Sequence, residues 1–367
     1  MHDLEKIAVY RLQVPLAKPY RLSFGAVEHY DTIVVELVGR DGGAGLGEAT
    51  VLTGYTDETI DDSWRAAIQF ARETAAGGGR SMRGTLPQLG EHYPFTATAF
   101  GTALEMLEGS PHLIVPRATA IPLVGLLHAT DEDAIHAEFE DLLAAGYRTI
   151  KVKVGFDPAT DARVIGTVQN VVKGRAAIRI DANQGYSAEQ GMAFASALDP
   201  RDIELFEQPC AAGDWESHLA VARVSPVPLM LDESIYGVAD IEKTAALKAA
   251  AYVKVKLMKL GTLDALAQAI DRIRALGMRP VLGNGVACDL GCWMEGCIAA
   301  KHIDNAGEMN GFLKARAPLL TTELAFSDGA LWLKPDFSPR LDAGNVKRYL
   351  IDSVVCEPRQ AMTARET

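Results

Sequence analysis

Short apolar segments recur along residues 121–311 at nearly constant spacing, and this recurrence limits the fold more than any other feature. Eight such segments start 28, 27, 27, 24, 24, 28 and 27 residues apart, and amphipathic stretches typical of helices separate most of them. Alternating strands and helices predict either a doubly wound parallel sheet or a barrel. Eight strands favour an α/β fold of the TIM-barrel type with a modified last helix, (β/α)7β. The expected strands are 121–127, 149–155, 176–183, 203–209, 227–234, 251–259, 279–285 and 306–311.

The residues on either side of this repeat have a different character. Strand-like segments at 7–14 and 32–38, a turn at Asp41-Gly42-Gly43 and a helix at 96–107 predict an α+β unit with antiparallel strands. Residues 315–367 return to strand and loop character and are expected to pack on that unit. The expected organisation is an α+β domain at 1–115, a barrel at 116–314 and a returning C-terminal segment at 315–367.

Charge and composition exclude several classes of function. The net charge is −12, the pI is about 5.2 and no basic run occurs, so nucleic acid and anionic membrane surfaces are disfavoured as partners. No apolar stretch of membrane-spanning length and no signal-peptide pattern occurs, which predicts a cytoplasmic protein. The five cysteines are odd in number and irregularly spaced, so we interpret Cys288, Cys292 and Cys297 as packing thiols rather than zinc ligands.

Three acidic residues follow successive predicted strands at the barrel end that carries function in this architecture. Asp181, Glu207 and Asp232 are 26 and 25 residues apart, one barrel unit each. Neighbouring strands lie about 4.8 Å apart, so three such carboxylates can meet around one cation. An all-oxygen set favours Mg²⁺, with Mn²⁺ as an alternative, over zinc. Taken singly, an acid at a strand end is more often a helix cap or the partner of an arginine, and the three in register favour the metal.

Two pairs of lysines repeat one pattern on strands that lie across the barrel from each other. Lys151 and Lys153 point to the same side of one strand, and Lys254 and Lys256 repeat this phase on another. A carboxylate substrate between them would meet an amine on each face. We therefore expect α-proton abstraction with Lys153 as the base on one face, Lys256 on the other, and Lys151 lowering the pKa of Lys153. The competing interpretation is that these are surface lysines at strand ends without a catalytic role.

These strand ends resemble the enolase superfamily, and within it the muconate-lactonizing enzyme (muconate cycloisomerase) subgroup. The resemblance spans about 120–312 and extends more loosely to the N-terminal unit, which is similar to that family's capping domain. It implies Mg²⁺ ligation by the three acids, acid/base roles for Lys153 and Lys256, and usually a homo-oligomer. The matching motifs are K-V-K at 151–153, D-A-N at 181–183, E-Q-P at 207–209, D-E-S at 232–234 and V-K-L-M-K at 255–259.

The resemblance also implies a supporting set of residues around the ligands. Asn183 and Glu233 would orient the metal ligands, and Glu308 would contact the substrate carboxylate region or a catalytic lysine. Lys254 and Asn284 complete this outer set. The segment Leu282-Gly283-Asn284-Gly285 contains no His, which disfavours the mandelate-racemase branch, and Glu308-Met309-Asn310 does not match the Asp-x-Asp of the dipeptide epimerases.

Substrate specificity is expected from two capping loops at 17–30 and 49–56. Aromatic side chains there suggest partial apolar enclosure, and Arg21 could pair with a second anionic group. The first hypothesis is an isomerase, namely a cycloisomerase or a racemase/epimerase of an amino-acid derivative. A dehydratase of an acid sugar or hydroxy amino acid is the alternative, and a non-catalytic barrel that binds a small acid is the third. The candidate specificity residues are Tyr20, Arg21, Phe24, Thr53 and Tyr55.

Overall fold

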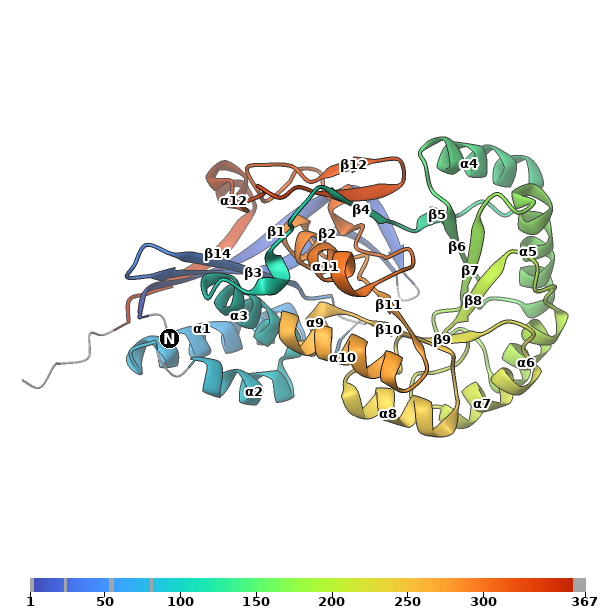
Figure 1. Ribbon diagram of the computed structural model, residues 1–367, viewed down its shortest axis with the longest axis horizontal. Coiled ribbons are helices and arrows are strands. Elements are labelled where there is room, and N and C mark those ends of the chain that lie inside the picture. Colours follow the sequence, from blue (N-terminus) through green and yellow to red (C-terminus); the bar gives the residue numbers. More distant parts are fainter. Residues whose placement is uncertain (1–2, 23–24, 53–55, 80–81, 359–367) are drawn as a thin grey trace, which may run out of the picture.

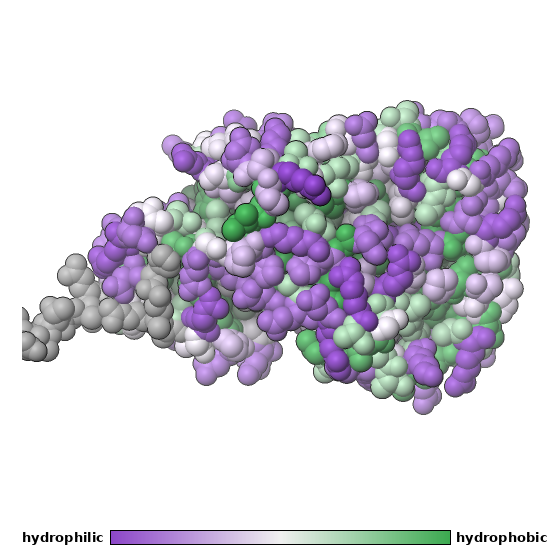
Figure 2. All heavy atoms as spheres, in the orientation of Figure 1, coloured by the Kyte–Doolittle hydropathy of each residue, from purple (hydrophilic) through white to green (hydrophobic). Residues whose placement is uncertain are grey.

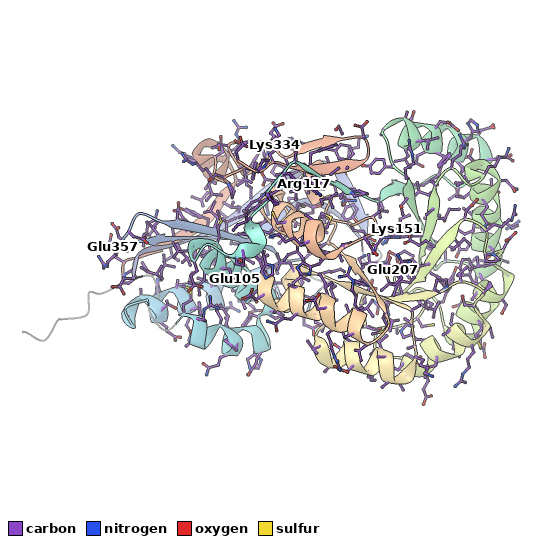
Figure 3. The ribbon with its side chains drawn as sticks, in the orientation of Figure 1. Glu105, Arg117, Lys151, Glu207, Lys334 and Glu357 are labelled. Atoms are coloured by element: carbon purple, nitrogen blue, oxygen red, sulfur yellow. The ribbon has the colours of Figure 1, made fainter. Side chains whose placement is uncertain are left out.

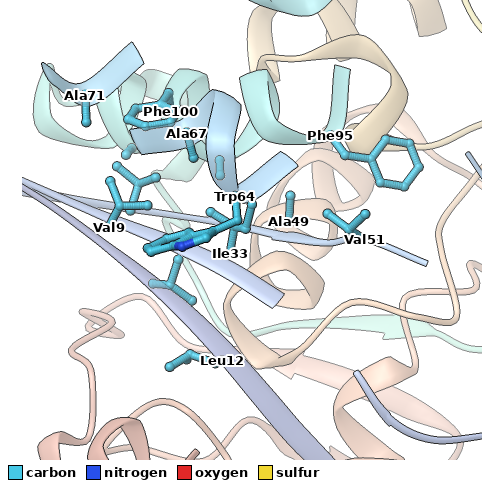
Figure 4. Packing of buried hydrophobic residues seen from close by; sticks show 14 of the residues in the cluster. Val9, Leu12, Ile33, Ala49, Val51, Trp64, Ala67, Ala71, Phe95 and Phe100 are labelled. Carbon is cyan, nitrogen blue, oxygen red and sulfur yellow. The ribbon is translucent and has the colours of Figure 1, made fainter. Parts of the chain in front are cut away.

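The computed structural model describes residues 3–22, 25–52, 56–79 and 82–358 (Figure 1). Its N-terminal unit is an antiparallel sheet in the order β14, β1, β2, β3, covered by helices. The strands are β1 (Leu4–Leu22), β2 (Gly25–Gly39), β3 (Ala44–Thr50) and β14 (Leu350–Cys356), and the helices are α1 (Ile60–Ala76), α2 (Met82–His92) and α3 (Pro94–Leu107). Buried side chains of this unit meet where Trp64 of α1 packs beside Ile33 of β2 (Figure 4).

The first two strands are longer than the sequence pattern predicts. The pairing of β1 with β2 continues to Tyr20↔Val27 and Leu22↔Gly25, so the segment expected to be a loop at 17–30 is instead the end of a long hairpin. Cross-strand backbone bonds extend it beyond the apolar stretch that marked the strand in the sequence. The expected turn at 41–43 is confirmed, because Asp41 Oδ1 accepts a hydrogen bond from Gly43 N at 3.0 Å between β2 and β3.

Glycines in β3 allow α3 to lie directly on the sheet. A Cβ atom at Gly47 would come within 1.9 Å of the carbonyl oxygen of Ala99, and one at Gly45 within 2.0 Å of that of Ala103. Only glycine permits such a close backbone approach. This strand was not predicted, because its small residues lack the β-branched and aromatic character of a strand signal.

The barrel strands lie side by side, in parallel, in the order β11, β10, β9, β8, β7, β6, β5, and helices cover their outer surface (Figure 1). The strands are β5 (Gly125–Leu127), β6 (Thr149–Lys153), β7 (Ala177–Asp181), β8 (Ile203–Glu207), β9 (Leu229–Leu231), β10 (Tyr252–Val255) and β11 (Arg279–Leu282). The helices are α4 (Glu132–Ala144), α5 (Pro158–Val172), α6 (Ala188–Ala197), α7 (Trp215–Val224), α8 (Val238–Leu247), α9 (Leu257–Leu260), α10 (Leu263–Ala275) and α11 (Asp289–His302).

The eighth predicted strand, 306–311, closes the barrel without forming a regular strand. Gly307 O accepts from Val124 N at 3.0 Å, directly before β5, and Glu308 N donates to Leu282 O of β11 at 3.0 Å, so the segment lies between the two edge strands of the sheet. Asn310 N then donates to Glu308 O at 2.7 Å, which turns the chain into the short 3₁₀ helix η2 (Gly311–Leu313). The predicted modified TIM barrel is confirmed, and the predicted extent of this strand is wrong.

Two other predicted strands end early. The segment 251–259 is a strand only to Val255, because Glu295 of α11 accepts a hydrogen bond from Leu257 N at 3.1 Å and starts the short helix α9. The segment 121–127 divides into β4 (Thr119–Pro122) and β5, since β4 pairs antiparallel with β13 while β5 pairs parallel with β6.

The C-terminal segment returns to the N-terminal unit, as expected. After η1 (Pro111–Leu113) and the barrel come β12 (Ala325–Ser327), β13 (Ala330–Leu333) and α12 (Ala343–Tyr349), and β14 then pairs with β1. The domain limits at 115 and 314 stay a prediction. Hydrophilic residues cover much of the visible surface (Figure 2). Within the described ranges, we find no helix with both the length and the apolar character that a membrane span requires.

Two glutamates of the N-terminal unit bind the start of barrel helices. Glu48 of β3 accepts hydrogen bonds from Cys288 N at 2.6 Å and Gly291 N at 2.9 Å, at the beginning of α11. Glu105 of α3 accepts from Leu263 N at 2.6 Å and Asp264 N at 2.9 Å, at the beginning of α10. Carboxylates satisfy the free N–H groups there and complement the helix dipole. These contacts attach β3 and α3 of the N-terminal unit to the barrel helices α11 and α10.

Candidate active site

Three carboxylates stand side by side at the carboxyl ends of adjacent strands. Asp181 ends β7, Glu207 ends β8 and Asp232 directly follows β9, with Asp181 and Glu207 in register. All three are buried, with exposed fractions of 1%, 0% and 2%. The parallel strands thus place residues separated by 26 and 25 positions on neighbouring strand ends, and their meeting around one ion stays a prediction.

Two lysines and a fourth acid lie among these carboxylates inside the barrel. Lys151 Nζ lies 3.0 Å from Asp181, 2.6 Å from Glu207 and 2.6 Å from Glu308. Lys254 Nζ lies 3.0 Å from Glu207 and 2.7 Å from Glu308. Figure 3 marks Lys151 and Glu207 at the curled strands. Burial lowers the pKa of both lysines, but the surrounding carboxylates outweigh it and raise each pKa above its ordinary value.

Two further lysines lie at opposite ends of the carboxylate row. Lys153 Nζ is 2.7 Å from Asp181 Oδ2, and Lys256 Nζ is 2.6 Å from Asp232 Oδ1. The Lys153 side chain is 36% exposed and that of Lys256 only 2%. Burial lowers the pKa of Lys153 and Lys151 lowers it further, as the sequence analysis expected, but Asp181 and Glu207 raise it above its ordinary value. The predicted contribution of Lys151 is present, and the carboxylates outweigh it.

Asn183 and Glu233 lie next to the candidate metal ligands Asp181 and Asp232. Asn183 has a left-handed backbone, with φ of 41°, and its N–H donates to Asp181 Oδ1 at 2.9 Å. Its side-chain oxygen accepts from Lys153, and its amide nitrogen donates to Glu233 Oε1 at 3.0 Å. Asn183 therefore links a catalytic candidate, a ligand candidate and a second acid.

Gln208 is a supporting residue that the sequence analysis missed as a separate site. Its Oε1 accepts from Asp232 N at 2.9 Å and Ser234 N at 3.2 Å, and its Nε2 donates to Ser234 Oγ at 2.8 Å. These hydrogen bonds fix the turn that carries Asp232. Gln208 itself is buried and has a positive φ of 39°. Its position directly after Glu207 in the E-Q-P motif was the available signal.

Lys259 is a second missed residue, and it braces the same turn. Its Nζ donates to the carbonyl oxygens of Asp232 at 3.3 Å and Ile235 at 2.9 Å, and it lies 4.1 Å from the centre of the Tyr236 ring. Burial lowers the pKa of Lys259 to about 8. Lys259 is the last residue of the V-K-L-M-K motif, but only the folded chain shows which groups it contacts.

The remaining candidates divide into three groups. Asn284 is buried in local contacts, with its Oδ1 accepting from Val286 N at 3.0 Å, so it supports the turn after β11. Burial raises the pKa of Tyr20, and the charges of Lys314, Lys153 and Lys151 outweigh burial and lower it. Arg21 lies in β1, but its side chain lies outside the described residues, as do Phe24, Thr53 and Tyr55 altogether.

The donor chemistry of the site fits a hard divalent cation. The three carboxylates contact lysines rather than one common point, so within the described ranges no three Asp, Glu, His or Cys side chains converge as a ready-made cage. They are nevertheless buried, anionic and all-oxygen, and they stand on adjacent strand ends. This is the ligand type that Mg²⁺ prefers.

Comparison with known proteins identifies the family. Residues 134–336, more than half of the chain, match the family model described as enolase C-terminal domain-like. The chain belongs to the enolase superfamily. It is 31% identical over 263 residues to an L-Lys-D/L-Arg epimerase of Methylococcus capsulatus, covering 68% of this chain and 73% of that protein. It is 23% identical over 353 residues to an L-Ala-D/L-Glu epimerase of Clostridium acetobutylicum, covering 90% and 94%.

Solved structures of this superfamily share the fold. A dipeptide epimerase from Cytophaga hutchinsonii, crystallised with Mg and D-Ala-L-Val, superposes with a TM-score of 0.86 at 18% identity, covering 97% of this chain and all of that one. A muconate lactonizing enzyme from Pseudomonas fluorescens gives 0.84 at 20% identity, covering 95% and 99%. The predicted resemblance and fold class are confirmed, and the chain is an enzyme of this superfamily, whose relatives here include epimerases, racemases and o-succinylbenzoate synthases.

Proposed function

We propose that this protein is a racemase or epimerase that removes the α-proton of a carboxylate substrate and returns it from the other face. The observation that carries the proposal is the placement of Lys153 and Lys256 at opposite ends of one carboxylate row, 2.7 Å from Asp181 and 2.6 Å from Asp232. A reaction that inverts one carbon needs a proton-transferring group on each face. The names of the relatives, mostly epimerases and racemases, support this outcome over cycloisomerisation.

The protonation state of each lysine decides whether it acts as the base or as the acid. In one direction Lys153, as a neutral amine, takes the α-proton while Lys256, as an ammonium, donates to the opposite face; in the other direction the roles are exchanged. The inner lysines hold Glu207 and Glu308 in place through ion pairs of 2.6–3.0 Å. Asn183 and Gln208 orient Asp181 and Asp232 through backbone and side-chain bonds.

Asp181, Glu207 and Asp232 would hold Mg²⁺. When bound, the ion supplies positive charge that stabilises the enediolate form of the substrate and opposes protonation of the nearby lysines. The ligand assignment rests on the buried all-oxygen donor set, and the Mg in the crystals of the Cytophaga hutchinsonii enzyme supports it. Mn²⁺ is an alternative occupant that a metal-substitution assay distinguishes.

The test is exchange of the α-proton in D₂O. N-acylated amino acids and dipeptides are incubated with the protein and Mg²⁺, and NMR measures both α-deuteration and the change of configuration. We expect deuterated product of inverted configuration, with no exchange after chelation. Exchange accompanied by loss of water would instead identify a dehydratase, and ring closure a cycloisomerase. Tight binding of a small acid with no exchange would contradict catalysis. Light scattering of the same sample measures the predicted homo-oligomer.

A further inference from the structure

A cleft opens where the β1–β2 hairpin meets the start of the barrel. We call it the Lys314 pocket. Its volume is about 690 Å³, enough for several non-hydrogen atoms of a ligand. Its walls come from the hairpin, from the end of β5 and from the segment after η2, and they include Lys18, Tyr20, Leu126, His128, Leu313 and Lys314.

Lys314 is the residue of this pocket whose positive charge lacks an anionic partner among the described residues. Its half-buried ammonium donates to Gly285 O at 2.5 Å and to Asn310 Oδ1 at 2.9 Å, and it lies 4.2 Å from the centre of the Tyr20 ring. Both acceptors are neutral. No carboxylate of the described ranges forms an ion pair with it, so its charge stays uncompensated and one of its three protons stays available.

The acids near the pocket are otherwise engaged. Glu138 of α4 accepts from His128 N at 2.9 Å and Ala129 N at 2.8 Å. Glu308 pairs with the inner lysines, Lys151 at 2.6 Å and Lys254 at 2.7 Å. A positively charged ligand group would therefore meet Lys314 with nothing to offset the repulsion, whereas a negative group would meet a pre-oriented donor.

Tyr20 connects this pocket to the reaction centre. Burial raises the pKa of Tyr20, but the charges of Lys314, Lys153 and Lys151 outweigh burial and lower it, so the hydroxyl lies within the field of all three lysines. Tyr20 also lines the pocket and carries the Lys314 ammonium on its ring face. Leu126, which also lines the pocket, pairs with Lys151 in the sheet, on the strand that ends in Lys153. A substrate whose α-carbon lies beside Lys153 thus has the Lys314 pocket within reach of its distal end.

We propose that the Lys314 pocket binds a second carboxylate at the distal end of the substrate, so that the enzyme acts on dianionic N-acyl amino acids rather than on substrates with a free ammonium group there. This inference rests on the proposed function for its reaction, and it adds the substrate class. Lys314 is the specificity-determining residue, and Tyr20 and Asn310 position its ammonium.

A matched pair of substrates tests the proposal. An N-succinyl amino acid ends in a carboxylate, and the N-succinamoyl derivative of the same amino acid ends in a neutral amide of the same shape. We expect kcat/KM for α-proton exchange to favour the carboxylate by about ten- to a hundredfold, the range for a hydrogen bond between charged groups. Lys314→Met should reduce that ratio to about one, and Lys314→Arg should restore part of it. Lys334→Met, at an exposed lysine outside the pocket, should leave the ratio unchanged.

The outcomes separate this proposal from the proposed function. Equal rates for the two substrates with the unaltered enzyme, or a preference that survives in Lys314→Met, would overturn the pocket assignment. If Lys18→Met rather than Lys314→Met removes the preference, the assignment to Lys314 is wrong. If neither substrate exchanges, the proposed reaction fails, and calorimetric binding of the same pair to the unaltered protein and to Lys314→Met still decides the pocket.

Discussion

Lys153 and Lys256 contact opposite ends of the same carboxylate row, Lys153 through Asp181 at 2.7 Å and Lys256 through Asp232 at 2.6 Å. Each lysine is thus tied to a different strand end, while Glu207 lies between them with inner lysines on both of its oxygens, Lys151 at 2.6 Å and Lys254 at 3.0 Å. The site is symmetric about Glu207 in its contacts, which suits a reaction that runs in both directions.

Removing one outer lysine should separate the two half-reactions. Lys153→Ala should lose racemisation by about 10²- to 10⁴-fold, yet still exchange the α-proton of the enantiomer whose proton faces Lys256. Lys256→Ala should show the opposite preference. NMR in D₂O with each pure enantiomer measures both variants. Full exchange of both enantiomers by Lys153→Ala would refute its role, and Lys347→Ala, at an exposed lysine of α12, should match the unaltered enzyme.

Mg²⁺ should stabilise the folded protein independently of any substrate. A cation that binds only the folded state adds about 2.7 kcal/mol to the free energy of unfolding when its free concentration is one hundred times Kd. Chemical denaturation with Mg²⁺ and with chelator measures the difference. Asp232→Asn should remove most of it, because one of the three proposed anionic ligands is lost. A Mg²⁺ effect of the same size in Asp232→Asn would contradict this ligand assignment.

The burial of Glu48 beside α11 should make stability depend on pH. Burial raises the pKa of Glu48 to about 7 in the folded protein, from an ordinary 4.5, although Gly291 N and Cys288 N oppose the rise. The folded state then holds this proton more tightly than the unfolded state, so the contribution of Glu48 to stability is lost as pH rises from about 4.5 through 7, by an amount of the order of 3 kcal/mol.

Glu48→Gln should remove this contribution. The difference in the free energy of unfolding between the variant and the unaltered protein should therefore change with pH across that range, as followed by denaturant titration. Glu189→Gln changes an exposed acid in the first turn of α6 and should give a profile parallel to that of the unaltered protein. A parallel profile for Glu48→Gln would show that the buried acid does not titrate as described.

The two kinds of glycine should respond oppositely to alanine. Gly47→Ala should lower the free energy of unfolding by at least about 2 kcal/mol, because the added Cβ would lie 1.9 Å from the Ala99 carbonyl oxygen and α3 would have to move. Gly166→Ala, inside α5 with open space around it, should raise stability by about 0.5–1 kcal/mol. Equal effects of the two substitutions in denaturant titrations would argue against the close packing of β3 on α3.

Much of the barrel and the reaction centre was determined by the sequence itself. Strand period and strand-end chemistry are local properties, so the spacing of Asp181, Glu207 and Asp232 was enough to predict their places on adjacent strand ends once a parallel barrel was inferred. The same holds for Lys153 and Lys256, since alternation along a strand decides which side a residue faces.

The tertiary structure alone decided which groups neutralise one another and where strands stop. Glu295 ends β10 from a helix 38 residues away, Glu48 reaches α11 across 240 residues, and Lys314 meets Gly285 and Tyr20 only after the barrel has closed. No local pattern specifies these contacts, because each depends on the free N–H groups, carbonyls and charges that distant elements bring to the same place. The sequence therefore determined the reaction centre, and the folded chain decided its supports and the charge of the adjoining pocket.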